Sequence, residues 1–96
     1  MTVVAKSESE TPGAGRTIRI VIADDHSVVR RGLRQLFEDE EGFEIVAEAG
    51  DIESASRYVR GHHPDVLVLD LNMPGGSSFE AIPQIRAEAP DTQMLS

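Results

Sequence analysis

Three aspartates stand out because they stand at the ends of two largely apolar runs. Asp24 and Asp25 come after the run Ile18–Ala23, and Asp70 comes after the run 66–69. If these carboxylates converge, each like-charge pair costs roughly 4 kcal/mol at about 4 Å and an effective dielectric near 20. Either a proton on one carboxylate or a bound hard cation relieves this repulsion. The residue types therefore predict an all-oxygen site that suits Mg²⁺ better than a transition metal.

The segments that carry these aspartates alternate between strand and helix patterns. Predicted strands cover Ile18–Ala23, Phe43–Ala49 and residues 65–69, a fourth begins near Asp91, and predicted helices follow Ser27, Asp51 and Ser78. Strict alternation argues for a parallel sheet with helices on both faces. In such sheets the functional crevice lies beyond the carboxyl ends of the strands. Because all three aspartates lie at such ends, they meet if the first and third strands are neighbours.

The first predicted helix carries an apolar stripe that we expect to face the core. Its members recur at spacings of three and four residues: Val29, Leu33, Leu36 and Phe37. Asp51 is the expected cap of the second helix. These patterns predict that the first helix packs on the core through its apolar stripe and that the second helix begins after Asp51.

Simpler roles stay open for several polar residues. One alternative is that Asp24 or Asp25 serves merely as the N-cap of the helix that begins beside it. This alternative leaves Asp70 without a role. His26 could donate to a phosphate, but a solvated loop histidine is favoured. The cluster of Arg30, Arg31 and Arg34 is favoured as a solvated helix face over a nucleic-acid patch.

Composition excludes several classes of function. The chain has 96 residues, a net charge of −8 from 17 acidic and 9 basic residues, and no cysteine. It allows one small domain, without disulfides or cysteine-ligated zinc, and its charge repels nucleic acid. No apolar run is long enough for a signal peptide or a membrane span, so we predict a cytoplasmic protein. Residues 1–17 are predicted to be a disordered leader, and residues 18–96 to form the domain.

The aspartates and their surroundings resemble a known family. The segment 20–26, Ile-Val-Ile-Ala-Asp-Asp-His, and the segment 66–75, Val-Leu-Val-Leu-Asp-Leu-Asn-Met-Pro-Gly, are similar to the receiver domain of two-component response regulators. The Asp-Asp-His start and the Asp-Leu-Asn-Met-Pro loop resemble the branch whose full-length members carry a LuxR/NarL-type helix-turn-helix. The resemblance runs from about Ile18 to Ser96. It implies a flavodoxin-like (CheY-like) α/β fold with strand order 2-1-3-4-5.

The resemblance implies a role for each residue of the acidic motif. Asp70 matches the phosphoacceptor and also contributes to the metal site. Asp25 matches the direct metal ligand, and Asp24 matches the residue that reaches the ion, usually through water. Asn72 matches the residue whose backbone carbonyl completes the protein's share of the Mg²⁺ shell.

The implied function is that of a phosphorelay receiver, which is not an enzyme in the ordinary sense. It would accept a phosphoryl group from a histidine kinase and change its surface, so as to control a homodimer or an attached transcriptional DNA-binding domain. This chain itself is expected to bind neither nucleic acid nor membrane. One alternative is a Mg²⁺-dependent aspartyl-phosphate phosphatase resembling the haloacid dehalogenases, which would want an acid where Asn72 stands. The other is a degenerate interaction fragment that is not phosphorylated.

The sequence departs from the family pattern at two places. Ser78 occupies a position that is typically glycine. The family's switch alcohol, its lysine, its fifth strand and its last two helices would all lie beyond Ser96, so the domain is expected to be incomplete. Without the last helix, apolar surface from the first and third strands is expected to face water. The expected lack of the lysine and the switch alcohol is the feature that favours the degenerate-fragment alternative.

Overall fold

Strands and helices alternate throughout the part of the chain that the computed structural model describes, residues 17–73 and 78–95. The strands are β1 (Ile18–Ala23), β2 (Phe43–Ala49), β3 (Val66–Leu69) and β4 (Gln93–Leu95), and the helices are α1 (Ser27–Glu38), α2 (Ile52–His62) and α3 (Ser78–Glu88). All paired strands are parallel, in the order β2-β1-β3-β4. The predicted parallel α/β fold is confirmed. The predicted leader, apart from Thr17, lies outside the described residues.

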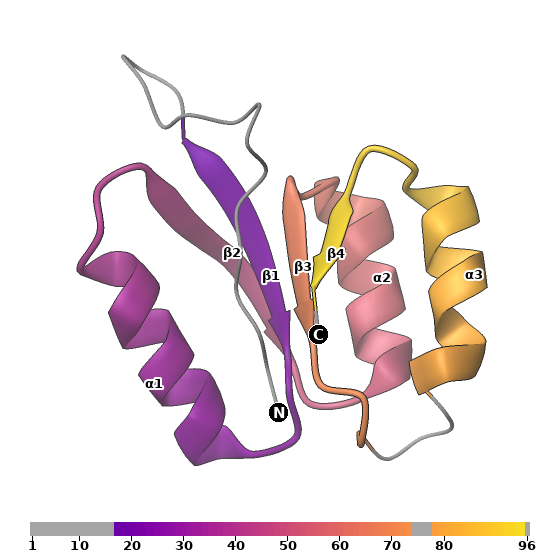
Figure 1. Ribbon diagram of the computed structural model, residues 1–96, viewed down its shortest axis with the longest axis horizontal. Helices are drawn as coiled ribbons and strands as arrows, with labels where there is room; N and C mark the ends of the chain where they lie inside the picture. Colours follow the sequence, from indigo (N-terminus) through magenta and orange to yellow (C-terminus); the bar gives the residue numbers. More distant parts are fainter. Residues whose placement is uncertain (1–16, 74–77, 96) are drawn as a thin grey trace.

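The sheet lies between two helical layers, with α1 on one side and α2 and α3 on the other (Figure 1). β3 is apolar throughout, and β1 is apolar apart from Arg19, as expected of strands that are buried on both faces. On the side of α2 and α3, strand residues pack against helix residues in one buried cluster, whose members include Val21, Ala23, Leu67, Leu69, Ala55, Val59 and Ile85. No helix among the described residues is long and apolar enough to cross a membrane.

The opposite face of β1 and β3 is also buried. Ile18, Ile20, Ile22, Val66 and Val68 are between 0% and 7% exposed and form a cluster with Phe37. Partly buried residues from α1, β2 and β4 pack against this cluster: Leu33, Phe43, Ile45 and Leu95. The expectation that apolar surface of the first and third strands faces water is therefore wrong.

The predicted stripe of α1 is only partly buried. Phe37 is 4% exposed and Leu33 is half-buried, but Val29 is 42% exposed and Leu36 is 59% exposed. At about 100° per residue, Leu33 lies about 40° around the helix from Phe37, whereas Val29 and Leu36 lie about 80° and 100° away. α1 therefore contacts β1 and β2 through the Phe37 side of its stripe, and the far side of the stripe is exposed.

The start of α2 is fixed as the sequence predicts. The carboxylate of Asp51 accepts the backbone N–H of Ser54 at 2.7 Å, and this contact lowers the pKa of Asp51. At the other end, His63 adopts a left-handed conformation with φ of 47° and donates its N–H to Val59. Each end of α2 therefore has a capping contact to a backbone group.

β2 contains an irregularity opposite the middle of β1. Ile20 aligns with Ile45, but the next residue, Val21, aligns with Ala47, so Val46 is an extra residue in β2. Such a bulge shifts every later side chain of the strand by one position relative to its neighbour. Beyond the bulge, Ala49 aligns with Ala23 at the carboxyl end of the sheet.

Candidate functional site

The register of the central strands brings the predicted aspartates together. Ala23 of β1 aligns with Leu69 of β3, so the next residues, Asp24 and Asp70, leave the sheet side by side. Their backbones continue the ladder, because the N–H of Asp70 donates to Ala23 at 2.9 Å and that of Asp24 donates to Ala49 at 3.0 Å. The convergence that the strand pattern predicted is therefore present.

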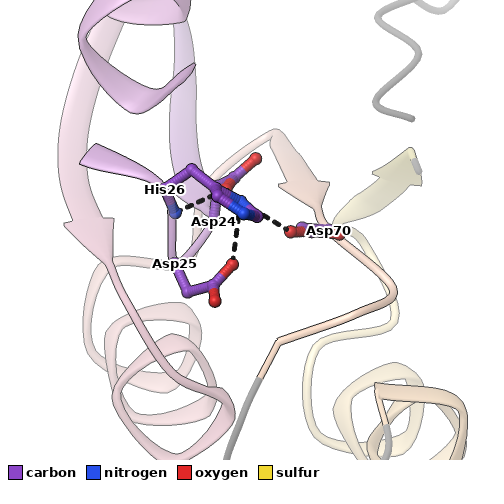
Figure 2. Close-up of side chains that lie close together, drawn as sticks. All are labelled: Asp24, Asp25, His26 and Asp70. Carbon is purple, nitrogen blue, oxygen red and sulfur yellow. Dashed lines mark hydrogen bonds and ion pairs between the residues drawn. The ribbon is translucent and has the colours of Figure 1, made fainter. Parts of the chain in front are cut away.

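Four side chains form the cluster shown in Figure 2, namely Asp24, Asp25, His26 and Asp70. One potential ligand atom from each lies within 4.8 Å of all the others. Asp24 is 3% exposed and Asp70 is 7% exposed, whereas Asp25 and His26 are exposed. The cluster thus has two buried carboxylates, and its other two side chains lie on the solvent side.

The ring of His26 points at the three carboxylates (Figure 2). Its Nδ1 lies 3.0 Å from an oxygen of Asp24, 3.0 Å from one of Asp25 and 3.7 Å from one of Asp70. The hydrogen bond with Asp24 and then the charge of Asp25 raise the pKa of His26. When it is protonated, the imidazole is a counter-ion to the cluster. The interpretation of His26 as a solvated loop residue is incomplete, because the ring is 64% exposed and yet contacts all three acids.

Backbone amides orient two of the carboxylates. An oxygen of Asp24 accepts the N–H of His26 at 2.8 Å, and an oxygen of Asp70 accepts the N–H of Asn72 at 3.0 Å. Each contact spans two residues, as in an Asx turn. His26 is the N-cap of α1 and makes no side-chain capping bond, so the alternative in which Asp24 or Asp25 only caps the helix is not supported. Asn72 is exposed beside Asp70, and the metal-ligand role of its carbonyl stays a prediction.

Arg30 of α1 also reaches the site. Its Nη1 donates to the backbone carbonyl of Asp24, and its Nε lies 3.7 Å from a carboxylate oxygen of Glu48. Arg34 contacts the same carboxylate at 2.9 Å. Two of the three arginines predicted to share a solvated face are thus paired with an acid of β2, which does not favour a nucleic-acid patch. The contact of Arg30 with Asp24 has no sequence signal beyond its position one turn into the helix.

The donor set suits a hard cation. Carboxylate oxygens of Asp24, Asp25 and Asp70 face a common point from the ends of two adjacent strands. Mg²⁺ takes a few carboxylate ligands and keeps several waters, which an open, partly buried site allows. The same point is contacted by His26 Nδ1, so the imidazole and a cation would compete for these oxygens.

Comparison with known families identifies the family and the fold. The model of the response regulator receiver domain matches residues 20–96, which include the whole acidic cluster. The chain belongs to this family. Within this receiver domain, the two segments that suggested the resemblance are the segments that carry the cluster.

Curated relatives of the receiver domain are regulators from several bacteria. It is 47% identical over 79 residues to the oxygen regulatory protein NreC of Staphylococcus epidermidis, covering 81% of this chain and 36% of the relative. It is 42% identical over 77 residues to the nitrate/nitrite response regulator NarP of Escherichia coli, covering 80% of this chain and 36% of that protein. The chain thus spans about a third of the length of these relatives.

Solved structures of response regulators share the fold. The signal receiver domain of the response regulator NarL from Mycobacterium tuberculosis superimposes with a TM-score of 0.77 at 29% identity, over 82% of this chain and 64% of that one. A LuxR-family response regulator from Aurantimonas gives 0.75 at 41% identity, over 81% and 56%. The resemblance to the LuxR/NarL-type branch is confirmed.

Proposed function

We propose that the receiver domain accepts a phosphoryl group on Asp70 from the phosphohistidine of a histidine kinase. The observation that supports this most directly is the placement of Asp70. It follows directly on the central strand β3 and is 7% exposed, and it lies in a cluster with two further carboxylates. A nucleophile that is fixed at a sheet end and approachable from one side suits attack in line with a leaving group.

The proposed transfer needs a carboxylate oxygen to approach an anionic phosphoryl group. A bond forms between an oxygen of Asp70 and phosphorus while the bond between phosphorus and the donor's imidazole nitrogen breaks, and the departing imidazole takes up a proton. Asn72 holds one oxygen of Asp70 through its N–H, and the other lies on the side of His26, 3.7 Å from its Nδ1. The turn after β3 therefore orients the nucleophile before the donor arrives.

Mg²⁺ is the cofactor that fits this chemistry. When bound, it would cancel the repulsion between the carboxylates and the phosphoryl oxygens. The proposed ligands are carboxylate oxygens of Asp25 and Asp70 and the backbone carbonyl of Asn72, with Asp24 reaching the ion through water. The all-oxygen character of the cluster and its mixture of buried and exposed acids support this assignment.

The proposed output is control of transcription by a domain outside this chain. NreC and NarP are longer than the matched region, and one neighbour, RcsB of Salmonella enterica, has a structure bound to promoter DNA with a phosphomimetic. The net charge of −8 makes direct binding of DNA by this chain unfavourable. Phosphorylation would then change the surface of the receiver domain that a DNA-binding domain or a second copy contacts.

The alternatives are weaker on specific grounds. The phosphatase would want an acid at Asn72, and the family match is to receiver domains. If the chain is instead a degenerate fragment, its acidic cluster should not accept a phosphoryl group. The labelling experiment below distinguishes this alternative from the proposal.

The test is labelling of the chain with acetyl phosphate in the presence of Mg²⁺, followed by intact-mass measurement. We expect an acid- and base-labile mass increase in the wild type and in Asp91→Asn, a control in which an exposed aspartate remote from the cluster is changed. Asp70→Asn should eliminate the increase, because the amide is not a nucleophile for phosphorus. A mass increase that persists in Asp70→Asn, or that never forms in the wild type, would contradict the proposal.

A further inference from the structure

Arg30 ties the loop that carries two of the acids to the body of the domain. The carbonyl of Asp24 accepts from the guanidinium of Arg30, and the N–H of Asp24 donates to Ala49 of β2 at 3.0 Å. The backbone of Asp24 is therefore held on both sides, by α1 and by β2. Because Asp25 is the next residue and begins the exposed turn, the direction of both carboxylates depends on this anchor.

The surroundings of Arg30 fix its side chain. The side chain is 25% exposed, and its Nε lies 3.7 Å from Glu48 in β2. Gly50 follows β2, and a Cβ placed on it would lie 3.5 Å from the Nη1 of Arg30. No side chain at Gly50 competes for the space that the guanidinium occupies, so a bulky residue there would displace it.

We propose that Arg30 is a positioning residue for the cation site, acting through the backbone of Asp24 and not as a ligand. This inference rests on the proposed function, which makes the cluster a Mg²⁺ site. Three carboxylates within a few ångströms repel one another, and a two-residue loop without an anchor relieves that repulsion by turning outwards. The bond from Arg30 opposes this movement in the absence of the ion.

Two effects of Arg30 on cation affinity have opposite signs. Its positive charge near the site disfavours a second cation, whereas its hold on Asp24 favours one. The carboxylate of Glu48 lies against the guanidinium and offsets much of its charge at the distance of the cluster. We therefore infer that positioning dominates, and the sign of the change on removing Arg30 distinguishes the two effects.

The experiment measures the Mg²⁺ dissociation constant of the whole chain by calorimetry, with Asp25→Ala as the reference for loss of the site. Arg30→Met should weaken Mg²⁺ binding on the order of tenfold, as is typical when a group that orients a metal ligand is removed. The double variant Arg30→Met/Glu48→Gln keeps the net charge and should show the same loss. Arg31→Met makes the same charge change at an exposed position of α1 and should stay close to the wild type. Equal or tighter binding in Arg30→Met than in Arg31→Met would overturn the proposal.

A second measurement does not depend on the ion. Amide hydrogen exchange at Asp25 and His26, measured in the metal-free chain, should be faster in Arg30→Met than in Arg31→Met, and Arg30→Lys should recover part of the protection. Gly50→Leu, which displaces the guanidinium and leaves all charges in place, should reproduce the effect of Arg30→Met. If the wild type fails to bind Mg²⁺, the metal part of the proposed function fails, while unchanged exchange at these amides in Arg30→Met would overturn the role of Arg30.

Discussion

His26 shows how the cluster is balanced in the absence of an ion. Three carboxylates share one imidazole nitrogen, at 3.0, 3.0 and 3.7 Å. The hydrogen bond from the ring of His26 to Asp24, followed by the charge of Asp25, raises the pKa of His26 above 6.5. The folded state therefore binds this proton more tightly than the unfolded chain does. The linked stability is fully present below the unfolded pKa and is lost as pH rises through the folded pKa.

We predict that the ring of His26 titrates above 6.5 in the folded, metal-free chain. Nuclear magnetic resonance of the ring protons against pH measures this directly. Asp25→Asn should lower the pKa of His26 towards its ordinary value, because it removes the second-largest cause without touching the hydrogen bond to Asp24. A titration at or below 6.5 in the wild type would show that the imidazole does not serve as counter-ion.

The acids of the site could be predicted from the sequence, but two of their partners could not. Asp24 and Asp70 follow apolar strands, and parallel strands bring their carboxyl ends to one edge whatever the details of packing. The contacts of His26 and Arg30 depend on the path of a short turn and on side-chain rotamers. Neither is expressed in residue spacing, so the sequence indicated only a solvated histidine and a solvated arginine.

Among the elements, α1 separates buried from exposed apolar residues within one stripe. Phe37 is 4% exposed and its ring lies 5.4 Å from that of Phe43, whereas the neighbouring Leu36 is 59% exposed. The spacing of apolar residues predicts that a helix is amphipathic, but it does not determine how widely the partner sheet covers it. For this reason the helix was predicted and the exposure of Val29 and Leu36 was not.

We expect Phe37→Ala to destabilise the domain by about 3–4 kcal/mol, because it leaves a cavity between α1 and the sheet. Leu36→Ala, one residue away on the same helix, should change the free energy of unfolding by less than about 0.5 kcal/mol. Urea denaturation monitored by circular dichroism measures both. Similar losses in the two variants would mean that α1 packs through a different face.

The whole molecule is organised around two central strands. β1 pairs with β2 and β3, and β3 pairs with β1 and β4, so each has a partner on both sides. Apart from Arg19, their residues on both faces are almost fully buried, whereas β2 is half-buried along most of its length. The alternation of elements predicted the parallel sheet, and the family resemblance implied this order of its strands; both are confirmed. They did not predict that the apolar face beside α1 is covered, because that depends on side chains from three elements.

We predict that opening of the domain follows this arrangement. In native-state hydrogen exchange, amides of β1 and β3 that donate within the sheet should be the most protected, and those of β2 and β4 should exchange through smaller, local openings. Mild denaturant should raise the exchange rates of the β2 and β4 amides less steeply than those of the β1 and β3 amides, because local openings expose less surface. If β2 exchanged as slowly as β3, the sheet would open only as one unit.

The bulge in β2 sets which side of the sheet each later residue of the strand occupies. With Val46 accommodated as an extra residue, Glu48 aligns with Ile22, on the side of α1, where Arg30 and Arg34 contact it. If β2 paired with β1 without the bulge, Val46 would align with Val21 and Glu48 with Ala23, and an anionic side chain would then enter the apolar layer beneath α2. The bulge therefore restores the side that Glu48 needs, and it links the pairing of β2 to the anchoring of the loop that follows β1. The same sequence paired without the bulge would keep its composition and its hydrophobic content, and would still lose the electrostatic partner of Arg30.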